Sequence, residues 1–332
     1  MTRKQQQFLA QKGISKPSIT NGLALSNIGL GTYLGDATEE HDTGYIQAIQ
    51  KSVMLGCNLI DTAINYRGQR SELNVSKALQ QIFANSDITR DELVIATKGG
   101  FTPSDWRSGR IGRDARQDMK DFYQYSVAPI LGKDATGNER INFIEADFIE
   151  WAFNQSLHNL SLAKINIYYL HNPEMSLETL GEDTFYTELE KTFYFLESQV
   201  KAGKLGIYGF ATWSGFLADE SEANYLNLEK VLETAKHAGG DNHSFKVIQL
   251  PYNQAKTEAS DKLNQNGHSI LDAAKANNLT VFTNVSLNQG KDFDRFTPES
   301  MINFLIEDER IDCALIGMKD PNKVERNLKQ IL

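Results

Sequence analysis

The sequence predicts an α/β protein with the fold of a (β/α)8 TIM barrel, on the basis of two patterns. Short, continuous apolar runs alternate with segments of helical periodicity along nearly the whole 332-residue chain, and the alternation repeats eight times. Such runs are typical of strands buried on both faces, and their alternation with helices indicates a parallel sheet. Eight units favour a closed barrel, whereas an open doubly wound sheet is the structural alternative on the pattern alone.

Each expected strand is a short apolar run, and each is followed by an expected helix. The strands are expected at Ser26–Tyr33, Asn58–Ala63, Leu93–Lys98, Asn166–Leu170, Gly206–Thr212, Lys246–Leu250, Thr280–Asn284 and Cys313–Ile316. The helices are expected at Glu40–Met54, Ser71–Phe83, Phe143–Leu160, Thr187–Ala202, Asn227–Ala238, Ser269–Ala276, Pro298–Glu307 and Asn322–Leu332.

Two segments fall outside this alternation. Residues 1–24 form a peripheral segment with a polar start and a turn-rich stretch that could form a hairpin. Residues 101–142 are too long for an ordinary connection, and they predict an elaborated loop after the third strand, on the substrate side. No composition shift or short repeat divides the chain, so residues 1–332 are expected to form one domain.

Composition limits the classes of function. The formal net charge is −9, so no basic footprint points to nucleic acid, although a local site for an anion is not excluded. Cys57 and Cys313 both lie beside apolar runs and are expected to be buried free thiols, which suits a reducing compartment. Met1–Lys12 lacks the apolar core of a signal peptide, and no apolar stretch is long enough to span a membrane. We therefore expect a cytoplasmic protein without a membrane partner.

Four polar residues lie at or just after the ends of the second, third and fourth expected strands. Asp61 ends the second strand, and Tyr66 follows in the next loop. Lys98 ends the third strand, and His171 follows the fourth. Neighbouring strand ends meet at one mouth of a barrel, so these side chains are expected to converge.

The chemistry of such a cluster follows from its residue types. A tyrosine titrates near pH 10, and a nearby lysine cation would lower that pKa while a carboxylate holds the lysine charged. An imidazole beside the phenol could orient a substrate carbonyl. The cluster therefore predicts a general acid for a carbonyl that receives a hydride, and no metal-ligand spacing accompanies it. Taken singly, each residue also has a simpler interpretation, such as a helix cap for Asp61 or a structural histidine for His171.

Several motifs together resemble the aldo-keto reductase family. They are Ile28-Gly29-Leu30-Gly31-Thr32, Leu59-Ile60-Asp61-Thr62-Ala63 with Tyr66 and Ser71-Glu72, Ala96-Thr97-Lys98, Tyr169-Leu170-His171-Asn172-Pro173, and Ile316-Gly317 with Glu325-Arg326-Asn327-Leu328. The resemblance implies a (β/α)8 barrel, NADPH-dependent carbonyl reduction, and a catalytic tetrad of Asp61, Tyr66, Lys98 and His171 with the tyrosine as acid. It also makes Gly29-Leu30-Gly31 a barrel turn instead of a dinucleotide fingerprint, whose third glycine is missing.

The same resemblance implies where a nicotinamide would bind. Gln249 matches a carboxamide-binding glutamine. The segment Gly209-Phe210-Ala211-Thr212-Trp213 departs from the family pattern, because Ala211 offers no side-chain hydrogen bond and Thr212 offers only a hydroxyl. Asn284 stands where many members have a tyrosine, and it gives less stacking on the ring.

The last expected unit resembles the family's adenosine-phosphate segment. The predicted contacts are Gly317, Lys319, Lys323 and Asn327, with lysine at 323 where many members have arginine. A solvated basic face on a terminal helix is the alternative. NADPH is favoured over NADH as the cofactor.

Candidate substrate contacts are the aromatic residues Tyr33, Phe101, Trp106 and Trp213, each of which could instead be loop packing. The leading hypothesis is an NADPH-dependent reductase of a small aldehyde or ketone, and a monomer is favoured. A second hypothesis is a cofactor-sensing or partner-binding subunit with little turnover, suggested by Ala211 and Asn284. A third is a barrel isomerase or lyase in which Lys98 forms a Schiff base.

Overall fold

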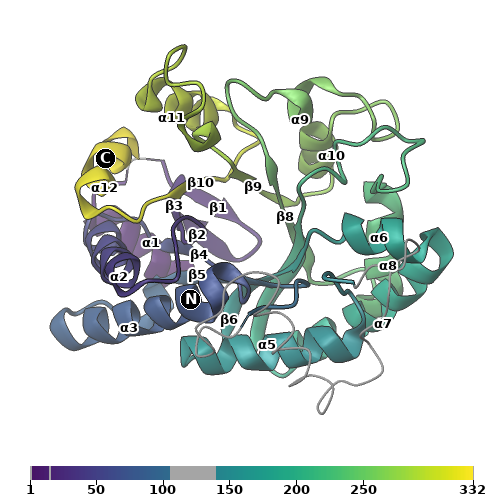
Figure 1. Ribbon diagram of the computed structural model, residues 1–332, viewed down its shortest axis with the longest axis horizontal. Coiled ribbons are helices and arrows are strands. Elements are labelled where there is room, and N and C mark those ends of the chain that lie inside the picture. The colour runs from purple at the N-terminus through teal and green to yellow at the C-terminus, as the bar shows by residue number, and fades with distance from the viewer. Residues whose placement is uncertain (1, 15, 105–139, 332) are drawn as a thin grey trace.

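The computed structural model describes residues 2–14, 16–104 and 140–331 of the chain. Eight parallel strands close into a barrel, in the order β10-β3-β4-β5-β6-β7-β8-β9. Helices surround this barrel (Figure 1). The prediction of an α/β TIM barrel is confirmed, and closure of the strand order excludes the open doubly wound sheet.

The barrel strands are short and almost wholly buried, as their apolar sequences predict. They are β3 (Ile28–Gly31), β4 (Leu59–Asp61), β5 (Val94–Gly99), β6 (Ile165–His171), β7 (Leu205–Ala211), β8 (Phe245–Pro251), β9 (Thr280–Asn284) and β10 (Cys313–Gly317). Successive side chains point to opposite faces of a strand. One set, including Leu59, Val94, Ile167 and Val247, forms its own buried cluster, separate from the larger core to which the helices contribute.

The outer helices lie close to the predicted ranges. They are α2 (Glu39–Met54), α3 (Arg70–Asn85), α5 (Ala146–Leu160), α7 (Glu182–Lys201), α8 (Leu228–Gly239), α10 (Ile270–Ala276), α11 (Pro298–Glu307) and α12 (Pro321–Leu328). Several begin at an N-cap whose side chain accepts a backbone N–H, as Asn227, Ser269 and Thr297 do. Pro298 occupies the first turn of α11, where its missing N–H has no intrahelical partner to lose.

Several short or peripheral helices have no counterpart in the prediction. They include α1 (Thr2–Gln11), α6 (Glu174–Leu180), α9 (Glu258–Asp261) and the 3₁₀ turn η1 (Tyr66–Gln69). The sequence does not predict α1, because its composition is mostly polar and only Gln5, Phe8 and Leu9 are buried in this helix. One narrow apolar face is enough to dock a surface helix.

The predicted N-terminal hairpin is present and covers the amino-terminal end of the barrel. Strands β1 (Ser18–Thr20) and β2 (Leu23–Leu25) pair antiparallel around a turn in which Asn21 has a φ of 43°. The Asn21 amide donates to the carbonyl oxygens of Asn278 at 2.9 Å and Lys246 at 3.3 Å, at the start of β9 and β8. With this end covered, the opposite mouth is the one left open for a ligand.

The two ends of the 101–142 insertion are held together beside the barrel. Phe101 and Asn142 form an antiparallel bridge, and the Phe143 N–H donates to the Gly100 carbonyl at 2.8 Å. Because Phe143 takes part in this pairing, α5 begins at Ala146 and the predicted start at Phe143 is wrong. Trp106 and most of the insertion lie outside the described residues.

Cys57 and Cys313 are free and buried, as predicted. Burial raises the pKa of the Cys57 thiol to about 11, so this thiol is protonated and unreactive at neutral pH. In the described part of the chain, no helix combines the length and apolar character needed to cross a membrane.

Candidate active site

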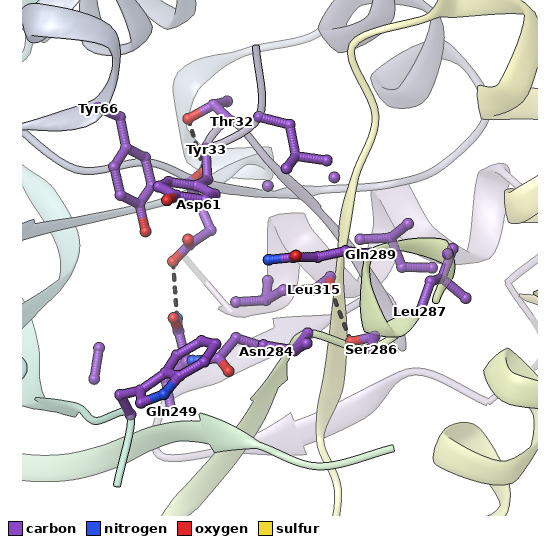
Figure 2. A pocket seen from close by; sticks show the side chains of 18 of the residues that line it. Thr32, Tyr33, Asp61, Tyr66, Gln249, Asn284, Ser286, Leu287, Gln289 and Leu315 are labelled. Atoms are coloured by element: carbon purple, nitrogen blue, oxygen red, sulfur yellow. Dashed lines mark hydrogen bonds between the residues drawn. The ribbon is translucent and has the colours of Figure 1, made fainter. Parts of the chain in front are cut away.

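A cavity of about 770 Å³ lies at the carboxyl end of the barrel strands. Its lining comes from both halves of the chain: Asp61, Tyr66 and His171 on one side, and Asn284, Gly317 and Asn327 on the other. Figure 2 shows Asp61 and Tyr66 on the same side of this pocket, with Gln249 and Asn284 below them. The volume is within the usual range for small-molecule and cofactor sites.

Asp61 and Lys98 form a buried ion pair at the base of the cavity. Lys98 is 0% exposed, and its ammonium donates to Asp61 Oδ1 at 2.5 Å and to the Thr62 carbonyl at 2.9 Å. Burial raises the pKa of Asp61 and lowers that of Lys98, and the opposite charge of the partner counters both shifts. Since β4 and β5 are adjacent strands, their registered ends bring the two residues together.

Tyr66 is the first residue of η1, in the loop after β4, and lies above this ion pair. The Lys98 ammonium is 5.0 Å from the centre of the Tyr66 ring. Burial and the nearby Asp61 charge raise the pKa of Tyr66 well above its ordinary value. The predicted net lowering of this pKa is therefore wrong, because burial disfavours the phenolate, the Asp61 charge adds to that effect, and together they outweigh the nearby Lys98 cation. The phenol stays protonated, which is the form that a proton donor needs.

His171 ends β6 and contacts the Tyr66 ring. The His171 and Tyr66 rings meet edge to face, with centroids 5.7 Å apart, and the Phe101 ring also meets the imidazole edge to face, with centroids 4.9 Å apart. Burial and the Lys98 charge lower the pKa of His171 well below its ordinary value, so the ring is neutral at physiological pH. Its Nδ1 is buried and has no partner among the residues that the structure describes.

A depressed histidine pKa has a consequence for stability. The unfolded chain takes up a proton as the pH falls below about 6.5, whereas the folded imidazole does not, so stability is lost on acidification. Between pH 7 and pH 5 we expect this residue to lower the free energy of unfolding of the wild type by at most about 2 kcal/mol. Urea unfolding of the wild type and of His171→Gln at both pH values measures it. Equal losses in the two proteins would contradict the neutral imidazole.

Asn142 holds the end of β6, and the sequence contains no signal for this role. Its amide donates to the His171 carbonyl oxygen at 2.7 Å, and its Oδ1 accepts from the Ser176 hydroxyl at 2.8 Å. Asn142 is the last residue of the insertion and no motif surrounds it. Only the return of the insertion to the barrel places it beside His171.

Gln249 lines the cavity from β8, and the structure shows where its amide points. Its Nε2 donates to Asp61 Oδ2 at 3.0 Å (Figure 2). The carboxylate therefore accepts from Gln249 on one oxygen and from Lys98 on the other. The backbone carbonyl oxygen of Gln249 accepts a hydrogen bond from the Thr212 backbone N–H at 2.8 Å, which aligns the ends of β7 and β8. A part in binding a carboxamide stays a prediction for Gln249.

Two orphan oxygens lie beside the place predicted for a nicotinamide. The Thr212 hydroxyl and the Asn284 Oδ1 are buried, and neither has a hydrogen-bond partner in the described ranges. Asn284 borders the cavity, whereas Thr212 does not. Buried polar atoms without partners are uncommon in proteins, so the Asn284 Oδ1 fits a bound group that presents N–H donors, such as a carboxamide. The Thr212 hydroxyl, outside the cavity lining, is not brought to the other predicted cofactor residues.

The far end of the cavity carries positive charge. Lys323 and Asn327 line it from α12. Arg326 lines it as well, although the sequence predicted no contact for this residue. Gly317 ends β10 opposite Gly31 of β3, and the two glycines leave the backbone there accessible to a ligand.

Lys319 and the start of α12 would both lie apart from a phosphate bound at this end of the cavity. Lys319 lies outside the cavity lining and its ammonium is 2.9 Å from His41 Nε2, so the structure does not bring it to the other predicted cofactor residues. The start of α12 is capped by Asp320, whose carboxylate accepts the Asn322 N–H at 2.9 Å. A phosphate would therefore depend on the Lys323 and Arg326 side chains more than on the helix terminus.

Aromatic side chains border the mouth. Tyr33 is 61% exposed and packs edge to face on Tyr66, while Trp213 is 50% exposed after the end of β7. Phe101 also lines the cavity, and Phe293 joins them from the loop after β9, where the sequence predicted no contact. Exposed large aromatics gathered around one cavity are typical of a binding site.

Fold and site together describe a (β/α)8 barrel protein with an ionisable cluster at the carboxyl ends of its strands. A family model for the aldo/keto reductase family matches residues 27–290, which is more than half of the chain. The chain therefore belongs to the aldo/keto reductase family, whose members are NAD(P)H-dependent oxidoreductases. No curated protein sequence matches it significantly.

Solved structures share the fold at low sequence identity. An aldo/keto reductase from Klebsiella pneumoniae, in complex with NADP and acetate, is 16% identical with a TM-score of 0.61, over 94% of this chain and 90% of that one. An aldo-keto reductase from Klebsiella pneumoniae in complex with NADPH gives 16% and 0.60, over 93% and 87%. A Pseudomonas aeruginosa protein assigned to the same class gives 16% and 0.60, over 96% and 94%.

Proposed function

We propose that the protein reduces an aldehyde or ketone to an alcohol with NADPH as the reductant. The observation that carries this proposal is the joint position of a protonated Tyr66, a neutral His171 and the Asp61–Lys98 pair beside one cavity. Family membership supports the reaction class. The NADP and NADPH bound to the Klebsiella pneumoniae proteins support the choice of cofactor.

Each residue of the cluster has a separate task in this reaction. His171 holds the substrate carbonyl by a hydrogen bond from its neutral ring, which places the oxygen near the Tyr66 hydroxyl. As the carbonyl carbon accepts a hydride, negative charge grows on that oxygen and Tyr66 transfers its proton there. The O–H bond of the phenol breaks, the O–H bond of the alcohol forms, and the phenolate regains a proton from water. Lys98 faces the Tyr66 ring and stabilises the phenolate while it lasts.

The chain's own residues fit a dinucleotide across the barrel mouth. Asn284 would hold the carboxamide end, and Lys323, Arg326 and Asn327 would hold the adenosine-phosphate end. When bound, reduced nicotinamide supplies the hydride that the protein itself cannot provide. Tyr33 and Trp213 shield the substrate side from water and provide apolar contact surface.

A fluorescence titration with NADPH and NADH, followed by an aldehyde panel, tests the proposal. We expect NADPH to bind and to be oxidised in the presence of at least one aldehyde. Binding without turnover would favour the cofactor-sensing subunit, for which Ala211 and Asn284 are the supporting departures. A Schiff-base lyase finds little support, because the Lys98 ammonium is inaccessible and donates to Asp61 and Thr62.

Cofactor preference should depend on the two cations of α12. NADPH carries one phosphate more than NADH, and a hydrogen bond to a charged group is worth about 1.5–3 kcal/mol. The variant Lys323→Ala/Arg326→Gln should therefore weaken NADPH binding about 10- to 100-fold and leave NADH binding within about threefold. Titration of both cofactors measures this, with Lys230→Ala on the distant α8 as the control. If the affinities for NADPH and NADH fell equally, Lys323 and Arg326 would not recognise the additional phosphate of NADPH.

A further inference from the structure

The backbone directly after Tyr66 adopts an uncommon conformation. Arg67, Gly68 and Gln69 have φ values of 52°, 63° and 74°, so three consecutive residues are left-handed. Glycine accepts this region freely, but arginine and glutamine enter it at an energetic cost. Such a turn persists only where the surrounding structure holds it in place, and strained backbone of this kind gathers at functional sites.

One anchor of the turn is the Arg67 side chain, which is buried toward α2. Its Nη2 donates to Asp42 Oδ1 at 2.6 Å, and its Nε donates to the Asp36 carbonyl at 2.9 Å. The guanidinium also lies 5.1 Å from the centre of the Tyr45 ring. The Asp36–Thr38 segment follows Tyr33 and Leu34, so Arg67 ties the loop of the predicted proton donor to the loop that packs against it.

Asp42 accepts hydrogen bonds both from the turn and from α3. Besides Arg67, it accepts the Asn74 amide at 2.8 Å and the Arg70 Nε at 2.9 Å. Burial alone would raise the pKa of Asp42, but the hydrogen bonds from Arg70, Asn74 and Arg67 lower it overall. The carboxylate is therefore charged and fully engaged with side chains from the turn and from α3.

The second anchor is Gln69, whose side chain is buried on the other side of the turn. Its Oε1 accepts the Asn159 amide at 3.1 Å, and its Nε2 donates to the Ser104 carbonyl at 3.4 Å. The same Asn159 amide donates to the buried Glu72 carboxylate at 2.8 Å. The turn is thus held from α2 on one side and from α5 on the other.

We propose that the Asp42–Arg67 pair is a positioning device that locks the left-handed turn and thereby sets the place of Tyr66 over the substrate. Neither residue lines the cavity, so neither is a catalytic residue. The inference rests on the proposed function for its kinetic consequence, but the locking of the turn stands on the hydrogen bonds alone. Small displacements of a proton donor lower turnover strongly, while distant binding contacts are unaffected.

The test uses Asp42→Ala, Arg67→Met and the double variant in the full-length protein, with an aldehyde that the wild type reduces. We expect kcat to fall about 10- to 100-fold in each, and the NADPH Kd to stay within about twofold. The double variant should be no worse than the poorer single one, since both remove the same brace. Amide hydrogen exchange of the peptide around Tyr66 should rise in all three, whether or not the protein has turnover.

Arg310→Met is the matched control for loss of a partly buried guanidinium. Arg310 Nη1 donates to Asp272 at 2.9 Å and Nη2 to Asp308 at 2.8 Å, before β10 at the amino-terminal end of the barrel. It should lower Tm and keep kcat. Wild-type kcat in the Asp42 and Arg67 variants, or an equal loss in the control, would overturn the inference. If the wild type reduces no aldehyde, the proposed function fails, and the exchange data alone decide whether the turn is locked.

Discussion

Replacement of Tyr66 by phenylalanine should lower kcat about 10²- to 10⁴-fold, the range that a general acid usually contributes. The substitution removes one oxygen and keeps the ring that contacts Tyr33 and His171. The loss should therefore appear in kcat, with the NADPH Kd unchanged, because the hydroxyl acts only when charge develops on the carbonyl oxygen. Steady-state kinetics and fluorescence titration of the same preparation measure both.

Tyr208→Phe is a suitable control for this prediction. Tyr208 also carries a buried hydroxyl, which donates to Glu197 at 3.0 Å, but it lies within β7 in the core cluster outside the cavity. It should lose some stability and keep turnover. If Tyr66→Phe retained wild-type kcat, the assignment of the proton donor would be wrong.

Replacement of Lys98 by methionine should affect both stability and turnover. The side chain fills a similar volume, but Asp61 is left as a buried carboxylate without its cation. Removing one partner of a buried ion pair typically costs about 3–5 kcal/mol. Chemical denaturation of the folded protein should show a decrease of that size, and NADPH oxidation should be lost because the phenolate has no neighbouring cation.

A second substitution separates the two effects. In Lys98→Met/Asp61→Asn, the buried charge is absent, so much of the lost stability should return. Turnover should stay low, because the cation that faces Tyr66 is still missing. If the single variant Lys98→Met were as stable as the wild type, the Asp61 charge would not be desolvated. If the double variant recovered turnover, Lys98 would have no part in the reaction.

The sequence predicts the cluster because its members lie at periodic landmarks. Asp61, Lys98 and His171 each end an apolar run, and parallel strands in a barrel bring such ends to one mouth. Tyr66 follows only a few residues later, so the chain itself keeps it close. Arg326 and Phe293 lack such a landmark, since a basic residue on a terminal helix and an aromatic in a loop occur in many structural contexts.

The direction of the Tyr66 pKa shift could not be deduced from sequence. It depends on how deeply the ring is buried and on which group Lys98 faces, and both are three-dimensional quantities. The same holds for Gln249, whose motif predicts a ligand contact while its amide reaches Asp61 from a strand 188 positions away in sequence.

By itself, the sequence determines the barrel and the end at which its polar residues gather, because hydrophobic periodicity is a local property that burial of strands and helices enforces. The tertiary structure decides how these residues are charged and held. Desolvation depends on the closed barrel, and the left-handed turn after Tyr66 depends on buried partners from α2 and α5 that no local pattern places beside it.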